Sequence, residues 1–265
     1  MPKITPQILY KMKQEKELIS ALTCYNLLNA QICNKVGIEI LLVGDSLGNV
    51  LLGYETTIPV TMEDILYFTK IVARGNKSGM LAADMPFLSY QASNSDAVTN
   101  AGRLIKEGGA EAVKLEGGIE IIERVKAILD AGIPVMGHLG LLPQSVHKTG
   151  GYKVQGKNQE ESNHIIESAK KLEDAGAFAI VLECVPKDLA KLVTKEISIP
   201  TIGIGAGRYC DGQILVLEDM LGLTNGHSKK FVKEYVNLNK LIETAVTQYK
   251  LEVKNGDFPT DKHSF

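Results

Sequence analysis

The feature that most constrains this chain is a repeated pattern of short apolar runs that end on an ionisable residue. The run at residues 40–44 ends on an acid, and four later runs end in the same way. The residues that end these five runs are Asp45, Asp84, Glu116, His138 and Glu183. Continuous aliphatic runs of this length fit parallel-sheet strands that are covered on both faces, and ligands of α/β proteins bind beyond the carboxyl ends of such strands. The pattern therefore predicts buried strands whose ends carry chemistry.

Strand patterns alternate with helix patterns along the chain. The expected strands are residues 18–23, 39–45, 80–84, 112–116, 134–138, 178–183, 200–205 and 213–217. Helices are expected at residues 27–35, after Thr61, and at residues 95–107, 119–130, 160–175 and 187–196. Eight strands alternating with helices predict an α/β protein of the (β/α)8 TIM-barrel type, with function at the C-terminal ends of the strands. A doubly wound open sheet remains the alternative, since alternation alone does not prove closure.

Two further segments flank this repeat. Residues 5–16 follow a helical pattern with Thr5 as N-cap and Pro6 at the first helical position, and we expect this helix to cap one end of the core. Residues 231–254 predict a C-terminal helical extension of one or two amphipathic helices. No linker or shift in composition divides the chain, so we expect a single domain over residues 1–265.

Composition narrows the class of partner. The chain has 265 residues, and its 29 Lys and Arg against 31 Asp and Glu give a formal net charge of −2. This balance gives no electrostatic reason to expect a nucleic acid or an anionic membrane as partner, which leaves small molecules. The 4 cysteines form no Cys-x-x-Cys pair, and the first residues have no apolar signal core. We therefore expect free thiols and a cytoplasmic protein.

Three carboxylates from different strand ends, Asp45, Asp84 and Glu116, are candidate metal ligands. Oxygen ligands of this kind suit Mg2+, which keeps several waters and takes one or a few carboxylates. Zinc would prefer thiolates or histidines, which these three positions lack. The alternative is that each acid caps a helix or pairs with a lysine.

Lys114, His138 and one more acid, Glu183, complete the candidate site. Lys114 lies two residues before Glu116, so both side chains leave the same face of a strand, and a lysine inside a barrel implies anions around it. A structural ion pair between Lys114 and Asp45 or Glu116 is compatible with this. Glu183 follows an apolar run, which favours a general base, although it could instead cap the next helix. His138 could donate to a bound oxyanion or be structural.

Two glycine-containing loops give weaker evidence of function than the strand ends do. Residues 139–158 combine glycines with Lys148, Lys153 and Lys157, which suits a mobile lid over an anionic ligand, or a solvated surface loop. The glycines of residues 203–207 are typical of a phosphate-binding turn, but they are equally expected where a turn packs tightly.

Taken together, several blocks of the sequence resemble one family, ketopantoate hydroxymethyltransferase, over nearly the whole chain. The blocks are residues 43–48 (VGDSLG), 83–87 (ADMPF), 113–118 (VKLEGG), 137–141 (GHLGL), 150–156 (GGYKVQG), 182–186 (LECVP) and 202–207 (IGIGAG). The resemblance implies a Mg2+-dependent (β/α)8 barrel that transfers a hydroxymethyl group from 5,10-methylenetetrahydrofolate to 3-methyl-2-oxobutanoate. The product, 2-dehydropantoate, is formed in the first step of pantothenate biosynthesis. The resemblance also implies a homo-oligomer, commonly a decamer in bacteria.

Matched position by position, the resemblance assigns roles to the candidate residues. Asp45, Asp84 and Glu116 become metal ligands, some of them through water. Ser46 and Lys114, with Asp45, Asp84 and His138, become contacts of the keto acid. Glu183 becomes the proton acceptor, and the reaction passes through an enolate that Mg2+ stabilises.

The chain departs from the family pattern at two positions. Asn26 stands where members commonly have Asp, and Glu218 stands where many have His. Neither is a core catalytic position, so we expect local effects only. Two other functions remain open: a Mg2+-dependent carbon–carbon lyase acting on a 2-keto acid, which uses the same enolate chemistry, and a keto-acid-binding barrel without turnover.

Overall fold

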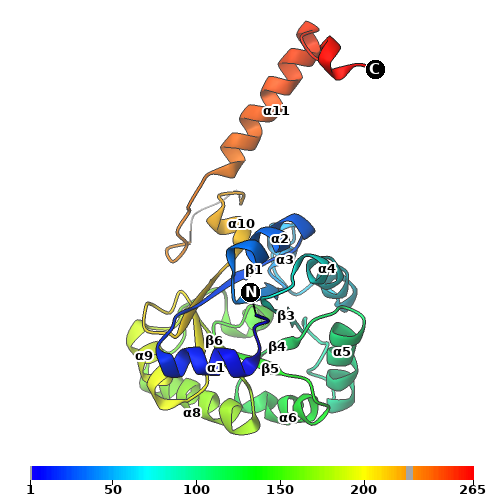
Figure 1. Cartoon of the computed structure of the whole chain (residues 1–265). Coiled ribbons are helices and arrows are strands. Elements are labelled where there is room, and N and C mark those ends of the chain that lie inside the picture. Colours follow the sequence, from blue (N-terminus) through cyan, green and yellow to red (C-terminus); the bar gives the residue numbers. More distant parts are fainter. Residues whose placement is uncertain (1, 225–228) are drawn as a thin grey trace. The chain divides into compact units, whose positions relative to one another are not determined.

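The computed structural model describes residues 2–224 and 229–265, and its centre is a closed parallel barrel (Figure 1). The strands pair in sequence order and β8 closes on β1. Their bounds are β1 Ile19–Thr23, β2 Ile40–Val43, β3 Met80–Asp84, β4 Ala112–Glu116, β5 Val135–Gly140, β6 Ala179–Glu183, β7 Thr201–Ile204 and β8 Gly212–Leu215. The prediction of a (β/α)8 barrel is confirmed, and closure excludes the open sheet.

Strands β2 to β7 have two buried faces that serve different layers, whereas β1 and β8 each carry one exposed side chain, Ser20 and Gln213. Side chains at alternate positions, such as Ile40, Ala82 and Met136, form one apolar cluster with their counterparts on the other strands. The intervening side chains, such as Leu41 and Leu115, belong to a second cluster shared with the surrounding helices. Because strand side chains alternate with period two, the first cluster fills the barrel and the second binds the helices to it.

The helices of this unit lie around the barrel (Figure 1). Those that follow the N-terminal helix are α2 Leu27–Val36, α3 Leu47–Val50, α4 Met62–Gly75, α5 Asn94–Lys106, α6 Ile122–Asp130, α7 Val146–Thr149, α8 Gln159–Ala175 and α9 Lys187–Glu196. Short 3-10 turns, η1 Ile119–Ile121 and η2 Pro143–Ser145, precede α6 and α7. Residues 205–211 join β7 to β8 without a helix. No helix in the described part of the chain combines the length and the apolarity needed to cross a membrane.

Polar side chains cap the first turns of α4 and α2. Thr61 and Asp64 form a reciprocal capping box at the start of α4. Asn26, one of the two departures from the family pattern, is the N-cap of α2, and its side chain accepts a hydrogen bond from the Asn29 N–H at 2.8 Å. Asparagine and aspartate cap helices about equally well, so this departure keeps the local structure.

The N-terminal helix α1, Pro6–Glu15, caps the barrel as predicted. Thr5 is its N-cap, and Leu9 is fully buried among the inward side chains of the strands. Lys13 extends from the same helix to the Ile199 carbonyl oxygen just before β7, at 2.9 Å. Since β7 begins at Thr201, α1 covers the N-terminal ends of the strands and leaves the C-terminal ends for a site.

The chain divides into two compact units, residues 1–216 and 217–265. Within the second unit, α10 Leu217–Met220 and α11 Leu238–Asn255 are followed by the 3-10 turn η3 Asp261–His263. Several boundaries were wrong. β2 ends at Val43 rather than at Asp45, and β5 extends to Gly140 rather than ending at His138. β8 stops at Leu215 because Leu217 already begins α10, and the long tail helix begins at Leu238 rather than at residue 231. Glu218 lies in α10. The expectation of one domain over residues 1–265 stays a prediction.

Candidate active site

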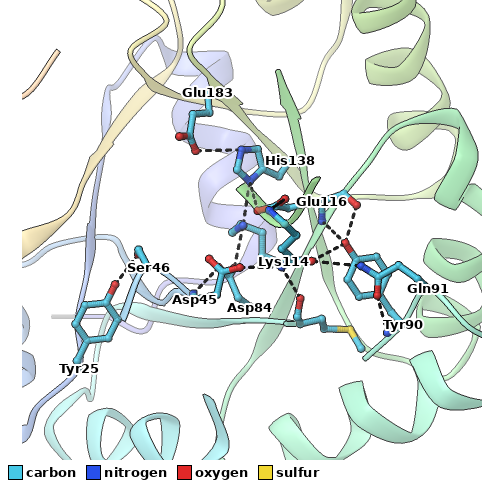
Figure 2. Close-up of polar contacts among 12 residues, drawn as sticks. Tyr25, Asp45, Ser46, Asp84, Tyr90, Gln91, Lys114, Glu116, His138 and Glu183 are labelled. Atoms are coloured by element: carbon cyan, nitrogen blue, oxygen red, sulfur yellow. Dashed lines mark hydrogen bonds and ion pairs between the residues drawn. The ribbon is translucent and has the colours of Figure 1, made fainter. Parts of the chain in front are cut away.

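The ionisable side chains singled out in the sequence lie at the C-terminal ends of β2 to β6. The inward positions of β3 to β6 that follow the apolar cluster are occupied by Asp84, Lys114, Glu116, His138 and Glu183. Asp45 comes two residues after the end of β2. Of these side chains, all but Glu183 are buried, and Figure 2 shows them directed toward one another.

Lys114 forms the centre of this group. Its ammonium lies 3.0 Å from Asp84 Oδ1, and both side chains are almost fully buried. The expected partner was Asp45 or Glu116, and the structure corrects this: Lys114 is in register with Asp84 on the neighbouring strand β3. Burial disfavours the charged ammonium, but the negative charges of Asp84, Glu116 and Asp45 outweigh the effect of burial. They raise the pKa of Lys114 above its usual value. Lys114 is therefore charged at every physiological pH.

His138 connects Lys114 with Glu183. Its Nδ1 lies 3.0 Å from Lys114 Nζ, and its Nε2 lies 3.3 Å from Glu183 Oε2 (Figure 2). Burial and the charge of Lys114 lower the pKa of His138, which favours the neutral ring. Glu183 does not cap the following helix, because the N-cap of α9 is Pro186. The capping alternative for Glu183 is thus excluded, and its carboxylate is free to face the barrel mouth.

Asp45 and Glu116 are held in surroundings that disfavour their charged forms. Burial, followed by the nearby charge of Asp84, raises the pKa of Asp45 to about 7. Burial and the charge of Asp45 raise the pKa of Glu116 well above its usual value. Asp84 Oδ2 accepts a hydrogen bond from the Asp45 N–H at 3.0 Å, which brings the ends of β2 and β3 together. The group therefore contains more buried acid than the one ammonium of Lys114 offsets.

Gln144, in the turn η2, is a site residue that the sequence reasoning missed. Its Nε2 donates to Asp45 Oδ2 and to the Met85 carbonyl oxygen, each at 2.9 Å, and its backbone N–H donates to Glu116 Oε2 at 3.0 Å. The side chain is 4% exposed. An uncharged residue in a loop gives no periodic signal, so nothing in the local sequence distinguished Gln144 from a solvated glutamine.

Ser46 lies beside Gly44, where a side chain would crowd three oxygen atoms. Its Oγ lies 2.7 Å from the Tyr25 hydroxyl, and Tyr25 is buried. A Cβ atom on Gly44 would lie 3.1 Å from Ser46 Oγ, 3.5 Å from Asp84 Oδ2 and 3.6 Å from the Tyr25 hydroxyl. Three oxygen-bearing side chains thus border one position that the absence of a side chain at residue 44 leaves free.

The two glycine-containing loops have different surroundings. Tyr152, in the proposed lid, has its pKa raised by partial burial and by the charges of Asp45, Glu183 and Glu116, so this loop lies within electrostatic reach of the acids. In the other loop Gly205 and Gly207 have positive φ, and a Cβ on Gly207 would lie 2.6 Å from that of Lys187. Close packing against the start of α9 therefore accounts for Gly207.

The donor set fits a hard divalent cation. Glu116 Oε1 is buried without a hydrogen-bond partner in the described part of the chain, and three carboxylates share the one ammonium. As the side chains stand, no three His, Cys, Asp or Glu groups of residues 2–224 and 229–265 converge on one point. Mg2+ commonly keeps several waters and binds through one or two carboxylates, so acids that surround a space without converging suit it.

Comparison with known proteins places the chain in a family. The family model described as ketopantoate hydroxymethyltransferase matches residues 3–261. The chain belongs to the ketopantoate hydroxymethyltransferase family. A relative from Syntrophomonas wolfei subsp. wolfei, named 3-methyl-2-oxobutanoate hydroxymethyltransferase, is 55% identical over 265 residues, covering 100% of this chain and 96% of the relative. A relative of the same name from Thermoanaerobacter sp. is 57% identical over 263 residues, covering 99% of this chain and 96% of the relative.

Solved structures share the fold at low identity. The alignment with a phosphonopyruvate hydrolase has a TM-score of 0.64 at 13% identity, and it covers 100% of this chain and 92% of the hydrolase chain. A 2,3-dimethylmalate lyase described as a PEP mutase/isocitrate lyase superfamily member has a TM-score of 0.62 at 16% identity, covering 100% of this chain and 93% of its own. At such identities the likeness shows that this chain and these enzymes share a barrel architecture.

Proposed function

We propose that this chain transfers a hydroxymethyl group from 5,10-methylenetetrahydrofolate to 3-methyl-2-oxobutanoate and so forms 2-dehydropantoate for pantothenate biosynthesis. Relatives that match nearly the whole chain are named for this activity. The observation that carries the proposal is the contact between Glu183 and His138, because it places a carboxylate base at the barrel mouth with the charge of Lys114 on the far side of the neutral His138 ring.

Asp45, Asp84 and Glu116 would hold Mg2+, in part through water. When bound, the cation would receive the ketone and carboxylate oxygens of the keto acid and offset the negative charge that develops on the ketone oxygen. The buried acids suit this role because burial, followed by their mutual repulsion, raises the pKa of Asp45 and Glu116, and added positive charge favours their charged forms.

The keto acid would lie between the acids and Glu183. Lys114 supplies fixed positive charge near the developing oxyanion, and Ser46 offers a hydroxyl beside the open position at Gly44. His138 presents its Nε2 toward Glu183 and so orients that carboxylate.

Glu183 would take the proton from C3 of the keto acid. The carbanion is delocalised onto the ketone oxygen, and C3 then attacks the methylene carbon of the folate, which breaks one of its two C–N bonds. One water replaces the second C–N bond and leaves its hydroxyl on that carbon. The two released nitrogens take up the proton from Glu183 and the remaining proton of the water, so tetrahydrofolate is the leaving group. The charge of Lys114 favours the anion over the neutral ketone, so the base need not be strong. The loop of residues 150–156 would cover the mouth and exclude water, and Tyr152 is its side chain within electrostatic reach of the acids.

A carbon–carbon lyase acting on a 2-keto acid is the second candidate. It would use the same carboxylate, lysine and cation, and a solved lyase shares the fold at 16% identity. No contact among the described site residues favours cleavage over transfer, and the full-length relatives carry the transferase name.

We further propose a cytoplasmic homo-oligomer, commonly a decamer in this family, in which residues 1–265 act as one domain.

Exchange of the C3 proton tests the central step. With Mg2+ in deuterated water and no folate, the protein should remove the C3 proton signal of 3-methyl-2-oxobutanoate from the NMR spectrum. Glu183→Gln should slow exchange about 100-fold or more, since general-base catalysis contributes on this scale. Glu160→Gln, the same change on the exposed first turn of α8, should exchange normally. Full exchange in Glu183→Gln would remove Glu183 from the role, and absence of 2-dehydropantoate after addition of the folate would favour the lyase.

A further inference from the structure

The side chain of Gln144 lies where the ends of several strands meet. Its carboxamide contacts Asp45 after β2 and Met85 after β3, while its backbone contacts Glu116 at the end of β4. Gln144 itself is in η2, which follows β5. One uncharged residue thus joins four consecutive strand ends at the face of the barrel that holds the acids.

The orientation of the carboxamide is dictated by its neighbours. Both hydrogens of Nε2 face acceptors, Asp45 Oδ2 and the Met85 carbonyl oxygen. Rotation by 180° would bring Oε1 against these two acceptors, so the amide nitrogen must point to the acids. On the other side Oε1 accepts from Gln91 Nε2 at 3.3 Å.

Tyr90 supports the same arrangement from behind. Its buried hydroxyl lies 3.2 Å from Gln144 Oε1 and 2.7 Å from the Glu116 carbonyl oxygen, and its oxygen accepts from the Glu116 N–H at 3.1 Å. The single hydroxyl hydrogen has two competing acceptors, one at the end of β4 and one on Gln144 in the turn η2. The side chain of Gln144 is therefore held from both ends.

Gln144 donates a hydrogen bond to one carboxylate oxygen of each of two acids and none to the second oxygen of either. Asp45 Oδ2 and Glu116 Oε2 are occupied by its N–H groups, whereas Glu116 Oε1 has no hydrogen-bond partner in the described part of the chain. Fixing one oxygen of a carboxylate sets the direction of the other, as hydrogen bonds from outer residues do around many metal sites.

We propose that Gln144 is a positioning residue that orients Asp45 and Glu116 so that their remaining oxygens face a divalent cation. The inference rests on the metal role given to these acids in the proposed function. It also gives the loop after β5 a direct link to the cation site, because displacement of η2 would carry away the hydrogen bonds to both acids.

Manganese affinity tests this role apart from turnover. Mn2+ is titrated into the full chain without keto acid or folate and followed by EPR. Gln144→Leu keeps the approximate size of the side chain and removes its bond to Asp45, so Mn2+ binding should weaken about tenfold, the scale of one hydrogen bond to a charged group. Gln159→Leu makes the same change at the exposed first position of α8 and should bind like the unaltered protein.

A second variant keeps the test decisive if Gln144→Leu does not fold. Gln91→Leu removes the amide that donates to Gln144 Oε1, and it should weaken Mn2+ binding about two- to fivefold. In the double variant the loss should not exceed that of Gln144→Leu alone, because Gln91 acts through Gln144. A purely structural role would lower the melting temperature and leave the Mn2+ affinity of the folded protein unchanged.

The outcomes separate this inference from the proposed function. Normal Mn2+ binding by the unaltered protein with equal binding by both variants would overturn the role of Gln144 alone. Absence of Mn2+ binding by the unaltered protein would overturn the metal role of the acids and the role of Gln144 with it.

Discussion

Lys114 Nζ and His138 Nδ1 lie 3.0 Å apart, and this contact fixes the tautomer of the histidine. A lysine ammonium only donates hydrogen bonds, so Nδ1 must present its lone pair and the ring hydrogen must be on Nε2. Nε2, which carries that hydrogen, lies 3.3 Å from Glu183 Oε2, although the two do not form a hydrogen bond as the side chains stand. The contacts run from Asp84 through Lys114 and His138 to Glu183, across the neighbouring strands β3 to β6.

Two substitutions of His138 should therefore differ. In His138→Gln the amide nitrogen can take the place of Nε2 and still donate to Glu183, whereas the shorter side chain in His138→Asn can accept from Lys114 but cannot reach Glu183. We expect proton exchange at C3 to fall about 10- to 100-fold in His138→Asn and less in His138→Gln. Exchange is measured by NMR, with melting temperatures to compare folding. Equal rates in the two variants would show that the contact with Glu183 has no role.

Gly44 should be needed for the keto acid rather than for the fold. An alanine Cβ there would approach Ser46 Oγ to 3.1 Å and take up the open position beside Asp84. Because the Gly44 backbone is not in the left-handed region, the substitution Gly44→Ala adds no backbone strain. We expect KM for the keto acid to rise about tenfold with little loss of stability, as measured by initial rates and thermal unfolding.

Gly102→Ala is the matched control for Gly44→Ala. Gly102 lies in α5, and a Cβ there would meet no atom within 4 Å. Alanine in a helix is favoured over glycine by about 1 kcal/mol, so this variant should be slightly more stable and fully active. If Gly44→Ala kept the normal KM, Ser46 and Asp84 would not border the substrate.

The barrel and its inward acids were predictable because both depend on local pattern. Apolar runs separated by helices specify parallel strands, and a side chain two positions beyond an inward apolar residue is also inward. Asp84, Glu116 and Glu183 followed from this reasoning. The partner of Lys114 did not, because it depends on the register between β3 and β4, which no single strand encodes.

Gln144 escaped prediction for a related reason. Its side chain contacts residues far away in the sequence, such as Gln91 in the loop after β3 and Asp45 after β2, and only the folded loop brings them together. A glutamine in a polar loop has the same local signature whether it is solvated or buried. The start of α11 was missed because the amphipathic pattern that predicted the helix begins at residue 231, whereas residues 231–237 are not helical and α11 begins at Leu238.

Cys210 should make the protein less stable at alkaline pH. Burial raises the pKa of its thiol from 9.0 to about 11, so between these values the folded state keeps a proton that the unfolded chain has lost. Folding stability therefore falls as pH rises from about 9 to 11, by roughly 2 to 3 kcal/mol in total for this group. Urea unfolding of the unaltered protein and of Cys210→Ala at pH 8 and pH 10 should show a smaller pH-dependent loss in the variant. Equal losses of stability in the two proteins would contradict a raised pKa for the buried Cys210 thiol.

Lys13 should matter for stability and not for chemistry. Its ammonium lies 3.0 Å from Asp211 Oδ2 and donates to the carbonyl oxygens of Thr194 and Ile199, at the end of the barrel remote from Glu183. The two charged side chains are 11% and 16% exposed, so Lys13→Met leaves a mostly buried carboxylate without its cation and should cost about 2 to 4 kcal/mol. Urea unfolding measures this loss, and the C3 exchange rate of the folded variant should stay normal.

A second substitution identifies the cause of that loss. Asp211→Asn in the Lys13→Met chain should recover part of the stability, because the amide needs no counter-charge. Recovery would assign the loss to the unpaired carboxylate rather than to the packing of the lysine stem. A Lys13→Met protein as stable as the unaltered one would mean that α1 is held by its apolar side chains, Leu9 and Met12, alone.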